Sequence, residues 1–183
     1  MRVVAGSAGG IPLQVPKHAV RPTSDRVRES LFSVLGESVS EAKVLDLYAG
    51  AGALGIEALS RGAESAVFVE KHRPTSEFIR RNLEKARLEK IARIVVQEVD
   101  RFLNGATTTF DLVFADPPYA KSHEEESLAF KLLKNESLPN RLADSGVLIL
   151  EAAHPSPEPD LERWDVRDHR QYGATAIWIL QKK

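Results

Sequence analysis

The stretch DLYAGAGALG at residues 46–55 decides the fold of this chain. It follows a short apolar run that starts at Val44 and precedes residues with apolar side chains at helical spacing. The stretch contains the pattern G-x-G-x-x-G at Gly50, Gly52 and Gly55. Glycines between a strand and a helix allow a tight turn and a close approach of the backbone to a ligand. The sequence therefore predicts a strand, a ligand-binding loop and a helix in that order.

Further apolar runs alternate with helical stretches along the rest of the chain. These runs are rich in Val, Ile, Leu and Phe, as is typical of strands buried on both faces of a parallel sheet. The first run is at residues 44–47, and the others are at residues 66–69, 94–96, 112–114 and 147–150. Helices are expected over about residues 53–61, 74–87 and 124–133. This alternation predicts an α/β fold with a mostly parallel sheet.

The two ends of the chain differ from its middle. Residues 164–170 and 175–180 flank Tyr172-Gly173 without room for a helix, which predicts a closing β-hairpin and one antiparallel edge. The proline-rich loop at residues 154–159 is not expected to be helical.

Residues 1–40 are expected to form an extension, and residues 41–183 the main domain. Within the extension, Val3–Ala5 can pair with Ile11–Val15 across a glycine-rich turn. A helix is expected from Ser24 to Leu35, with Thr23 or Ser24 as its N-cap.

The bulk properties exclude several classes of protein. The chain has 183 residues, of which 43% are hydrophobic, and a formal net charge of −1. It has no cysteine, and its five histidines show no metal-ligand spacing, so no metal site is expected. No apolar run reaches the roughly 20 residues of a membrane span, and no secretory signal is visible, so a cytoplasmic location is expected. A monomer is expected for a chain of this size.

A second informative stretch, DPPY at residues 116–119, directly follows an apolar run. Its two prolines stiffen the turn and leave bare carbonyl acceptors. Asp116 adds a carboxylate acceptor, and Tyr119 offers a flat face on which a base can stack. Acceptors beside an aromatic face suit a flat ring that carries an amino group, whereas the alternative is a stiff surface turn.

Two acidic residues indicate which cofactor the glycine-rich loop binds. Glu70 ends the second apolar run, 20 residues after Gly50, where an acid can accept hydrogen bonds from ribose hydroxyls. A dinucleotide would place its pyrophosphate at the helix N-terminus. Asp46 puts a carboxylate close to the loop, which disfavours a pyrophosphate and suits a cationic ligand. The sequence therefore favours S-adenosylmethionine.

Three segments together resemble one family. They are RPTSDRVRESLF at residues 21–32, DLYAGAGALGIEALSRG at residues 46–62, and DPPY at residues 116–119. In these segments the chain resembles the RsmD family of class I S-adenosylmethionine-dependent methyltransferases, which methylate N2 of a guanine in bacterial 16S ribosomal RNA. The resemblance implies a Rossmann-like, seven-stranded sheet whose last strand is antiparallel. It also implies a small subunit or its 16S rRNA as the partner.

The resemblance also implies roles for individual residues. The loop residues Tyr48, Ala49, Gly50 and Gly52 would line the methionine side of the cofactor. Around it, Asp46 would lie near the methionine amino group, Glu70 would hold the ribose, Lys71 would flank the adenine, and Asp100, in preference to Glu98, would contact the adenine amino group. At the substrate, Asp116 and the Pro117 carbonyl would accept from the guanine amino group while Tyr119 stacks on the base. The expected RNA contacts are Lys17, His18, Arg21, Arg26 and Arg28.

Other functions stay open at this point. The literal G-x-G-x-x-G together with Glu70 would also suit a nicotinamide-dependent oxidoreductase. The DPPY stretch also occurs in DNA adenine-N6 methyltransferases, although these usually have a larger target-recognition region than this chain could hold. A non-catalytic RNA-binding module that keeps the fold is a further alternative.

Overall fold

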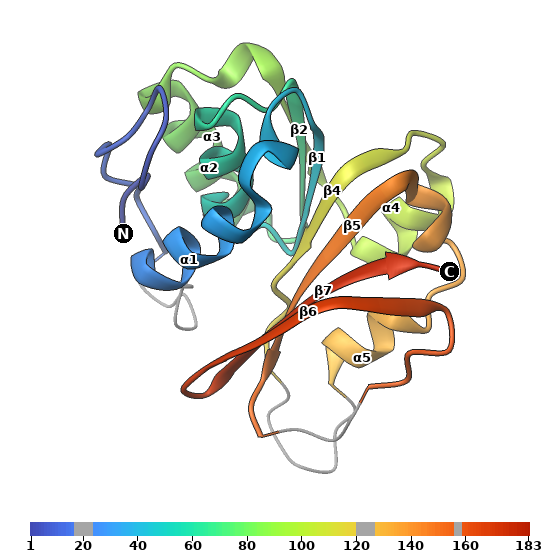
Figure 1. Cartoon of the computed structure of the whole chain (residues 1–183). Coiled ribbons are helices and arrows are strands. Elements are labelled where there is room, and N and C mark those ends of the chain that lie inside the picture. Colours follow the sequence, from blue (N-terminus) through green and yellow to red (C-terminus); the bar gives the residue numbers. More distant parts are fainter. Residues whose placement is uncertain (17–23, 120–126, 156–158) are drawn as a thin grey trace.

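The structure, a computed structural model, describes residues 1–16, 24–119, 127–155 and 159–183. Its centre is a seven-stranded sheet in the order β3-β2-β1-β4-β5-β7-β6 (Figure 1). The strands are β1 (Lys43–Leu47), β2 (Ser65–Glu70), β3 (Ala92–Val96), β4 (Phe110–Ala115), β5 (Leu142–Ala153), β6 (Trp164–Tyr172) and β7 (Thr175–Lys182). The α/β architecture predicted from the sequence is confirmed.

The strand directions agree with the sequence pattern. Strand β1 pairs in parallel with β2 and β4, β2 with β3, and β4 with β5. Strand β7 is antiparallel to both β5 and β6, so the predicted closing hairpin is present and β7 is inserted between β5 and β6.

Helices cover both faces of this sheet (Figure 1). The α-helices are α1 (Asp25–Leu35), α2 (Ala53–Ser60), α3 (Arg73–Ala86), α4 (Val99–Gly105) and α5 (Leu128–Leu133). Three short 3-10 helices lie at Gly36–Val39, Glu89–Ile91 and Pro139–Arg141. One core packs α1, α2 and α3 against side chains such as Phe68, and the other packs α4 and α5 against the alternate side chains such as Leu45.

Two details of the helix prediction need correction. Helix α5 begins at Leu128 and not at residue 124, because the described Ser127 has the non-helical backbone of an N-cap. The expected first turn, residues 124–126, lies outside the described residues, as do residues 156–158 of the proline-rich loop. Helix α4 was not predicted, because its seven residues bury only Val99 and Leu103 and so show too little periodicity.

The amino-terminal pairing is shorter than expected. Residues 1–16 fold back on themselves, but only Arg2 and Pro12 form an antiparallel bridge. The Val3 amide donates to the Ile11 carbonyl at 2.9 Å, and the Gly10 amide donates to the Val3 carbonyl at 2.8 Å. The next backbone groups bond elsewhere, so the hairpin cannot extend.

Those groups bond to helix α2. The fully buried Glu57 carboxylate accepts from the amides of Val4 at 2.7 Å and Ala5 at 3.0 Å. One turn later the Ser60 hydroxyl accepts from the Ala8 amide at 2.9 Å. A Cβ on Gly6 would lie 1.8 Å from the Ser60 carbonyl oxygen, so only glycine fits this close approach. Residues 1–16 therefore lie against α2 as a fixed strap.

Helix α1 begins as the sequence predicts. The Ser24 hydroxyl accepts from the Val27 amide at 3.3 Å, and Asp25 lies in the first turn, where an acid favours the helix dipole. Its Phe32 ring is buried and lies 5.6 Å from the Phe114 ring, which fixes the helix on β4. Within the described ranges, no helix has the length and apolar character needed to cross a membrane.

Replacing Glu57 tests the strap. Glu57→Ala would leave two backbone amides without their acceptor and Arg61 without its 2.7 Å ion-pair partner. We expect the free energy of unfolding to fall by about 3 kcal/mol, since a buried charge-assisted network is broken. Urea denaturation measures this loss. The exposed Glu64→Ala is the matched control, and equal stability of the two variants would contradict the assignment.

Candidate functional site

The candidate site lies where the strand order reverses. Strand β1 has β2, the next strand in sequence, on one side and β4 on the other. Ligands of open α/β sheets bind at such a switch point, beyond the carboxyl ends of the strands. Leu47, the last residue of β1, is level with Val69 of β2 and Ala115 of β4. The residues that follow these three positions therefore come together at one edge.

The glycine-rich loop leaves β1 at this edge. Tyr48 has a φ of 56°, which is uncommon for a residue with a side chain, and Gly52, the N-cap of α2, has a φ of 80°. At Gly55 a Cβ would lie 2.4 Å from the Phe68 ring. The absence of this Cβ lets α2 pack directly on β2. The glycines thus bring the helix N-terminus and the loop backbone to the end of β1.

Asp46 lies behind this loop, with 2% of its surface exposed. Its carboxylate accepts from the Gly55 amide at 2.9 Å. Its strand partners are Phe68 and Phe114, so its surroundings are largely apolar. Burial raises the pKa of Asp46 to about 7, the Gly55 amide opposes this rise, and the charge of Glu70 adds to it. A cation bound at the loop would favour the ionised form.

Glu70 closes the loop from the end of β2. One of its carboxylate oxygens accepts from the Gly50 amide at 3.0 Å, and the other accepts from the His72 amide at 2.8 Å. Each carboxylate oxygen has two lone pairs, so acceptor capacity remains for hydroxyl groups of a ligand. The sequence predicted the position of Glu70 but not its bond to the loop.

Two of the expected adenine-side residues, Glu98 and Asp100, lie close to Tyr48. Lys71 forms a 3.6 Å ion pair with Glu98, the N-cap of α4, and both side chains are largely exposed. Asp100, in the first turn of α4, accepts from the Asn135 side chain at 3.0 Å. Burial raises the pKa of Tyr48 to about 12, with contributions from the charges of Asp100 and Glu98. Both candidate acids therefore lie near the loop, and the choice between them stays a prediction.

The DPPY turn follows β4 on the other side of β1. Pro117 is buried, Pro118 is exposed, and Asp116 and Tyr119 are half-buried. Tyr119 donates its hydroxyl hydrogen to the Glu151 carboxylate at 3.0 Å, and its oxygen lies 2.9 Å from the Thr175 hydroxyl.

The pKa of Tyr119 is raised to about 12, mainly by burial. The neighbouring charges of Glu151 and Asp116 also raise it, whereas the hydrogen bond to Thr175 lowers it. The Tyr119 hydroxyl is therefore protonated at neutral pH.

Sequence analysis missed Glu151. It directly follows the apolar run that ends at Leu150, just as Glu70 follows Val69 and Asp116 follows Ala115. An acid immediately after a buried parallel strand is a signal that could have identified it, since such strands end at the same edge.

Asn82 of α3 was missed as well, and no local pattern marks it. It is fully buried, and its amide nitrogen donates to the carbonyls of Ala51 in the loop and of Gln14 in the strap, each at 2.9 Å. Its amide oxygen accepts from the Gln14 amide at 2.8 Å. One side chain thus holds the loop and the strap together.

Of the expected RNA-binding residues, the structure describes Arg26 and Arg28. Arg26 is exposed on α1, and Lys17, His18 and Arg21 lie outside the described residues. Arg28 is fully buried, pairs with Asp25 at 2.9 Å and donates to the Arg2 carbonyl. In this conformation it ties α1 to the strap, so it could reach RNA only if the start of α1 moved.

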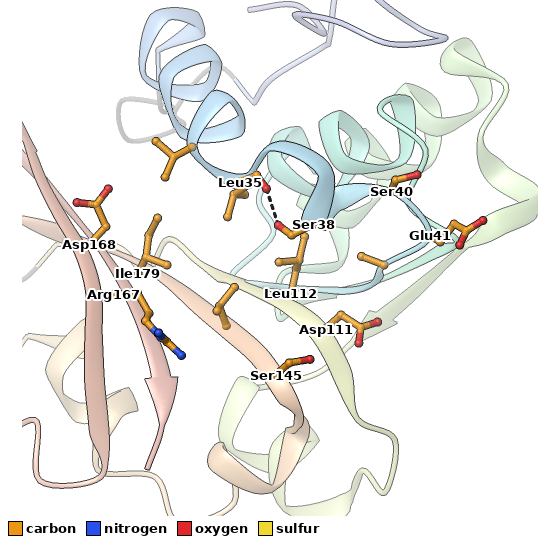
Figure 2. Close-up of a pocket in the computed structure, with 13 residues that line it drawn as sticks. Leu35, Ser38, Ser40, Glu41, Asp111, Leu112, Ser145, Arg167, Asp168 and Ile179 are labelled. Atoms are coloured by element: carbon orange, nitrogen blue, oxygen red, sulfur yellow. Dashed lines mark hydrogen bonds between the residues drawn. The ribbon is translucent and has the colours of Figure 1, made fainter.

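A cavity of about 690 Å³ lies elsewhere, at the amino ends of the parallel strands (Figure 2). It is lined by Leu35 at the end of α1, Ser38 of the following 3-10 helix, Asp111 of β4, Ser145 of β5 and Arg167 of β6. It is at the opposite end of the strands from the glycine-rich loop, so it is separate from the candidate site. No group of three potential metal ligands occurs among the described side chains.

Known proteins share this arrangement. The family described as "Conserved hypothetical protein 95" matches residues 1–181. The protein named ribosomal RNA small subunit methyltransferase D of Escherichia coli K12 is 34% identical over 185 residues, which cover 100% of this chain and 90% of that protein.

Solved structures agree with this match. A putative methyltransferase of Escherichia coli, yhhF, is 33% identical with a TM-score of 0.81, covering 100% of this chain and 98% of that one. A putative methyltransferase complexed with SAH shares the fold at a TM-score of 0.69 and 19% identity, covering 85% of this chain and 48% of that one. The full-length match and the level of identity show that this chain belongs to the family of the ribosomal RNA small subunit methyltransferase D proteins.

Proposed function

We propose that this chain transfers the methyl group of S-adenosylmethionine to the exocyclic N2 of a guanine in 16S ribosomal RNA. The observation that carries the proposal is the meeting, beside β1, of the glycine-rich loop with the DPPY turn at Asp116–Tyr119. Its relatives named for ribosomal RNA methylation support this substrate. The enzyme would act as a cytoplasmic monomer on the small subunit, with residues 1–40 facing the RNA.

The residues at the loop fit S-adenosylmethionine better than a dinucleotide. The cofactor carries a sulfonium cation and an amino group and has no phosphate. Glu70 bonds to the loop, and Asp46 directly behind it adds a negative charge when it ionises. This charge would repel a pyrophosphate and attract a cation. The same two acids therefore argue against a nicotinamide cofactor.

Each part of the cofactor would meet a different strand end. Asp46 would act on the methionine amino group through its charge, while the loop from Tyr48 to Gly52 would line the methionine. Glu70 would accept from the ribose hydroxyls with its remaining lone pairs. Lys71 and Asp100, in preference to Glu98, would flank the adenine.

The DPPY turn would prepare the nucleophile. The lone pair of an amine on an aromatic ring is delocalised, so the nitrogen attacks poorly. Asp116 and the Pro117 carbonyl would accept its two hydrogens and favour a pyramidal nitrogen with an available lone pair. Tyr119 would stack on the base, a contact worth roughly 1–3 kcal/mol. The cofactor supplies a methyl group activated by its sulfonium, and positioning contributes most of the acceleration.

The guanine must leave its stack to enter such a site, so a loop or single-stranded target is expected. Lys17, His18, Arg21 and Arg26 would contact the RNA backbone. The near-neutral net charge limits binding to naked RNA, because phosphate contacts set that affinity. An assembled small subunit is therefore the proposed substrate.

The function is tested by methyl transfer from labelled S-adenosylmethionine to small subunits that lack the modification. We expect label in 16S rRNA at a guanine N2, and saturable calorimetric binding of S-adenosylmethionine but not of NAD. Binding of NAD alone would refute the proposal. Transfer to adenine in DNA would instead support the second candidate, which shares the DPPY turn.

Replacing Asp116 tests the mechanism. Asp116→Ala removes the acceptor for the amine, so we expect kcat to fall by about 100-fold or more. Binding of S-adenosylmethionine should stay unchanged, because the residue would contact the substrate. Single-turnover methylation measures the first effect and calorimetry the second. The exposed Asp165→Ala on β6 is the control, and near-normal turnover of Asp116→Ala would exclude this mechanism.

The raised pKa of Asp46 predicts an opposite pH dependence of stability and of cofactor binding. The folded pKa is about 7, against 3.8 for the unfolded chain, so the protein loses stability as pH rises from about 4 to 7. The loss is at most roughly 4 kcal/mol. Over the same range S-adenosylmethionine should bind more tightly, because its positive charge favours the ionised carboxylate.

The variant Asp46→Asn keeps an acceptor for the Gly55 amide but cannot ionise. We expect it to melt at a higher temperature than the wild type at pH 8, and to bind S-adenosylmethionine more weakly with little pH dependence. Thermal melts and calorimetry between pH 5.5 and 8 measure both. A wild-type melting temperature that rises from pH 5.5 to 7 in parallel with that of the variant would contradict this role.

A further inference from the structure

The hydroxyl of Tyr119 lies between two side chains from different strands. It donates to Glu151 of β5 at 3.0 Å and lies 2.9 Å from the hydroxyl of Thr175, the first residue of β7. A phenol has one hydrogen to donate. Since that hydrogen goes to the carboxylate, Thr175 is the donor in the second bond. The hydroxyl of Tyr119 is thus held from two sides.

The register of the sheet explains how both groups reach one point. Thr175 is level with Ala153 of β5, two residues beyond Glu151. Side chains two residues apart on a strand lie on the same face. Glu151 and Thr175 therefore share a face of the sheet, and Glu151 is only 7% exposed there. Tyr119 reaches this face from the DPPY turn.

The β6–β7 hairpin, whose second strand begins at Thr175, is also bonded to helix α1. Tyr172, the last residue of β6, is level with Thr175. Its hydroxyl lies 2.7 Å from the Ser30 hydroxyl of α1. The end of the β6–β7 hairpin is thus bonded on one side to Tyr119 and on the other to α1, so it is a firm support for the Tyr119 ring.

The turn itself cannot fix this ring. Pro117 and Pro118 restrict the backbone, but the side-chain torsions of Tyr119 lie beyond their reach. A half-buried ring that turned freely would lose conformational entropy on stacking. Hydrogen bonds at the far end of the ring remove this cost before the substrate arrives, and the bond to a carboxylate is of the stronger kind.

We propose that Glu151 and Thr175 are positioning residues that hold the Tyr119 ring in place as the stacking surface for the target base. The proposal rests on the function proposed above. Glu151 and Thr175 act through the Tyr119 hydroxyl and do not touch the reacting atoms. Their loss should therefore weaken the use of the substrate and leave the cofactor site intact.

The test compares Glu151→Gln, Thr175→Val and Tyr119→Phe, each close in shape to the original residue. The substrate in each assay is the small subunit that lacks the modification. We expect KM for this subunit to rise about tenfold in the Glu151→Gln and Tyr119→Phe enzymes, because each loses a charge-assisted hydrogen bond. Thr175→Val should show a smaller rise. The Kd for S-adenosylmethionine, measured by calorimetry, should match the wild type in all three, and the exposed Glu64→Gln is the control.

The double variant Glu151→Gln/Tyr119→Phe distinguishes positioning from an independent role. If Glu151 acts through the Tyr119 hydroxyl, the double variant has the KM of Tyr119→Phe alone. Multiplied effects, or an unchanged KM in Glu151→Gln and Thr175→Val, would overturn the proposal while the wild type still methylates the subunit. A wild type without activity on the subunit would overturn the proposed function and this inference with it.

Discussion

The parallel pairing of β1 with both β2 and β4 is the constraint on which the rest of the structure depends. It places Leu47, Val69 and Ala115 level with one another. The chain therefore leaves three neighbouring strands at one edge, on the two sides of a switch point. Groups that are far apart in sequence meet there without needing a long loop to bring them together. The glycine-rich loop, Glu70 at the end of β2 and the DPPY turn lie close together because of this pairing.

Much of the fold could be predicted because the strands are dense apolar runs and a glycine-rich turn marks the first crossover. The failures have physical causes. Helix α4 buries only Val99 and Leu103, which is too weak a pattern for a sequence to reveal. The amino-terminal hairpin is limited to one bridge, and the amides that follow it, those of Val4 and Ala5, bond to Glu57 of α2 instead of across the hairpin. The competing acceptor lies on a helix that is distant in sequence, so the local sequence of residues 1–16 does not reveal it.

Some features of the candidate site could also be predicted from the sequence, whereas others could not. Asp46, Glu70 and Asp116 stand beside strand ends, where composition and order are informative. The structure adds what each of them bonds to, such as the Gly50 amide that Glu70 holds. Arg28 shows the limit: in the sequence it is one basic residue among several near α1, whereas in the fold it is fully buried. Whether a charged helical residue faces solvent or a neighbour depends on partners distant in sequence.

The strap at residues 1–16 has a consequence for how this protein can be divided. It supplies the backbone partners of Glu57, Ser60 and Asn82, three side chains that are otherwise buried on α2 and α3. A shorter chain that kept the sheet but lacked the strap would have to hydrate these groups or leave them unsatisfied, at a cost for each. Because Asn82 also donates to the Ala51 carbonyl, part of that cost would fall on the glycine-rich loop. A chain without the strap should therefore be less stable at α2, at α3 and at the glycine-rich loop.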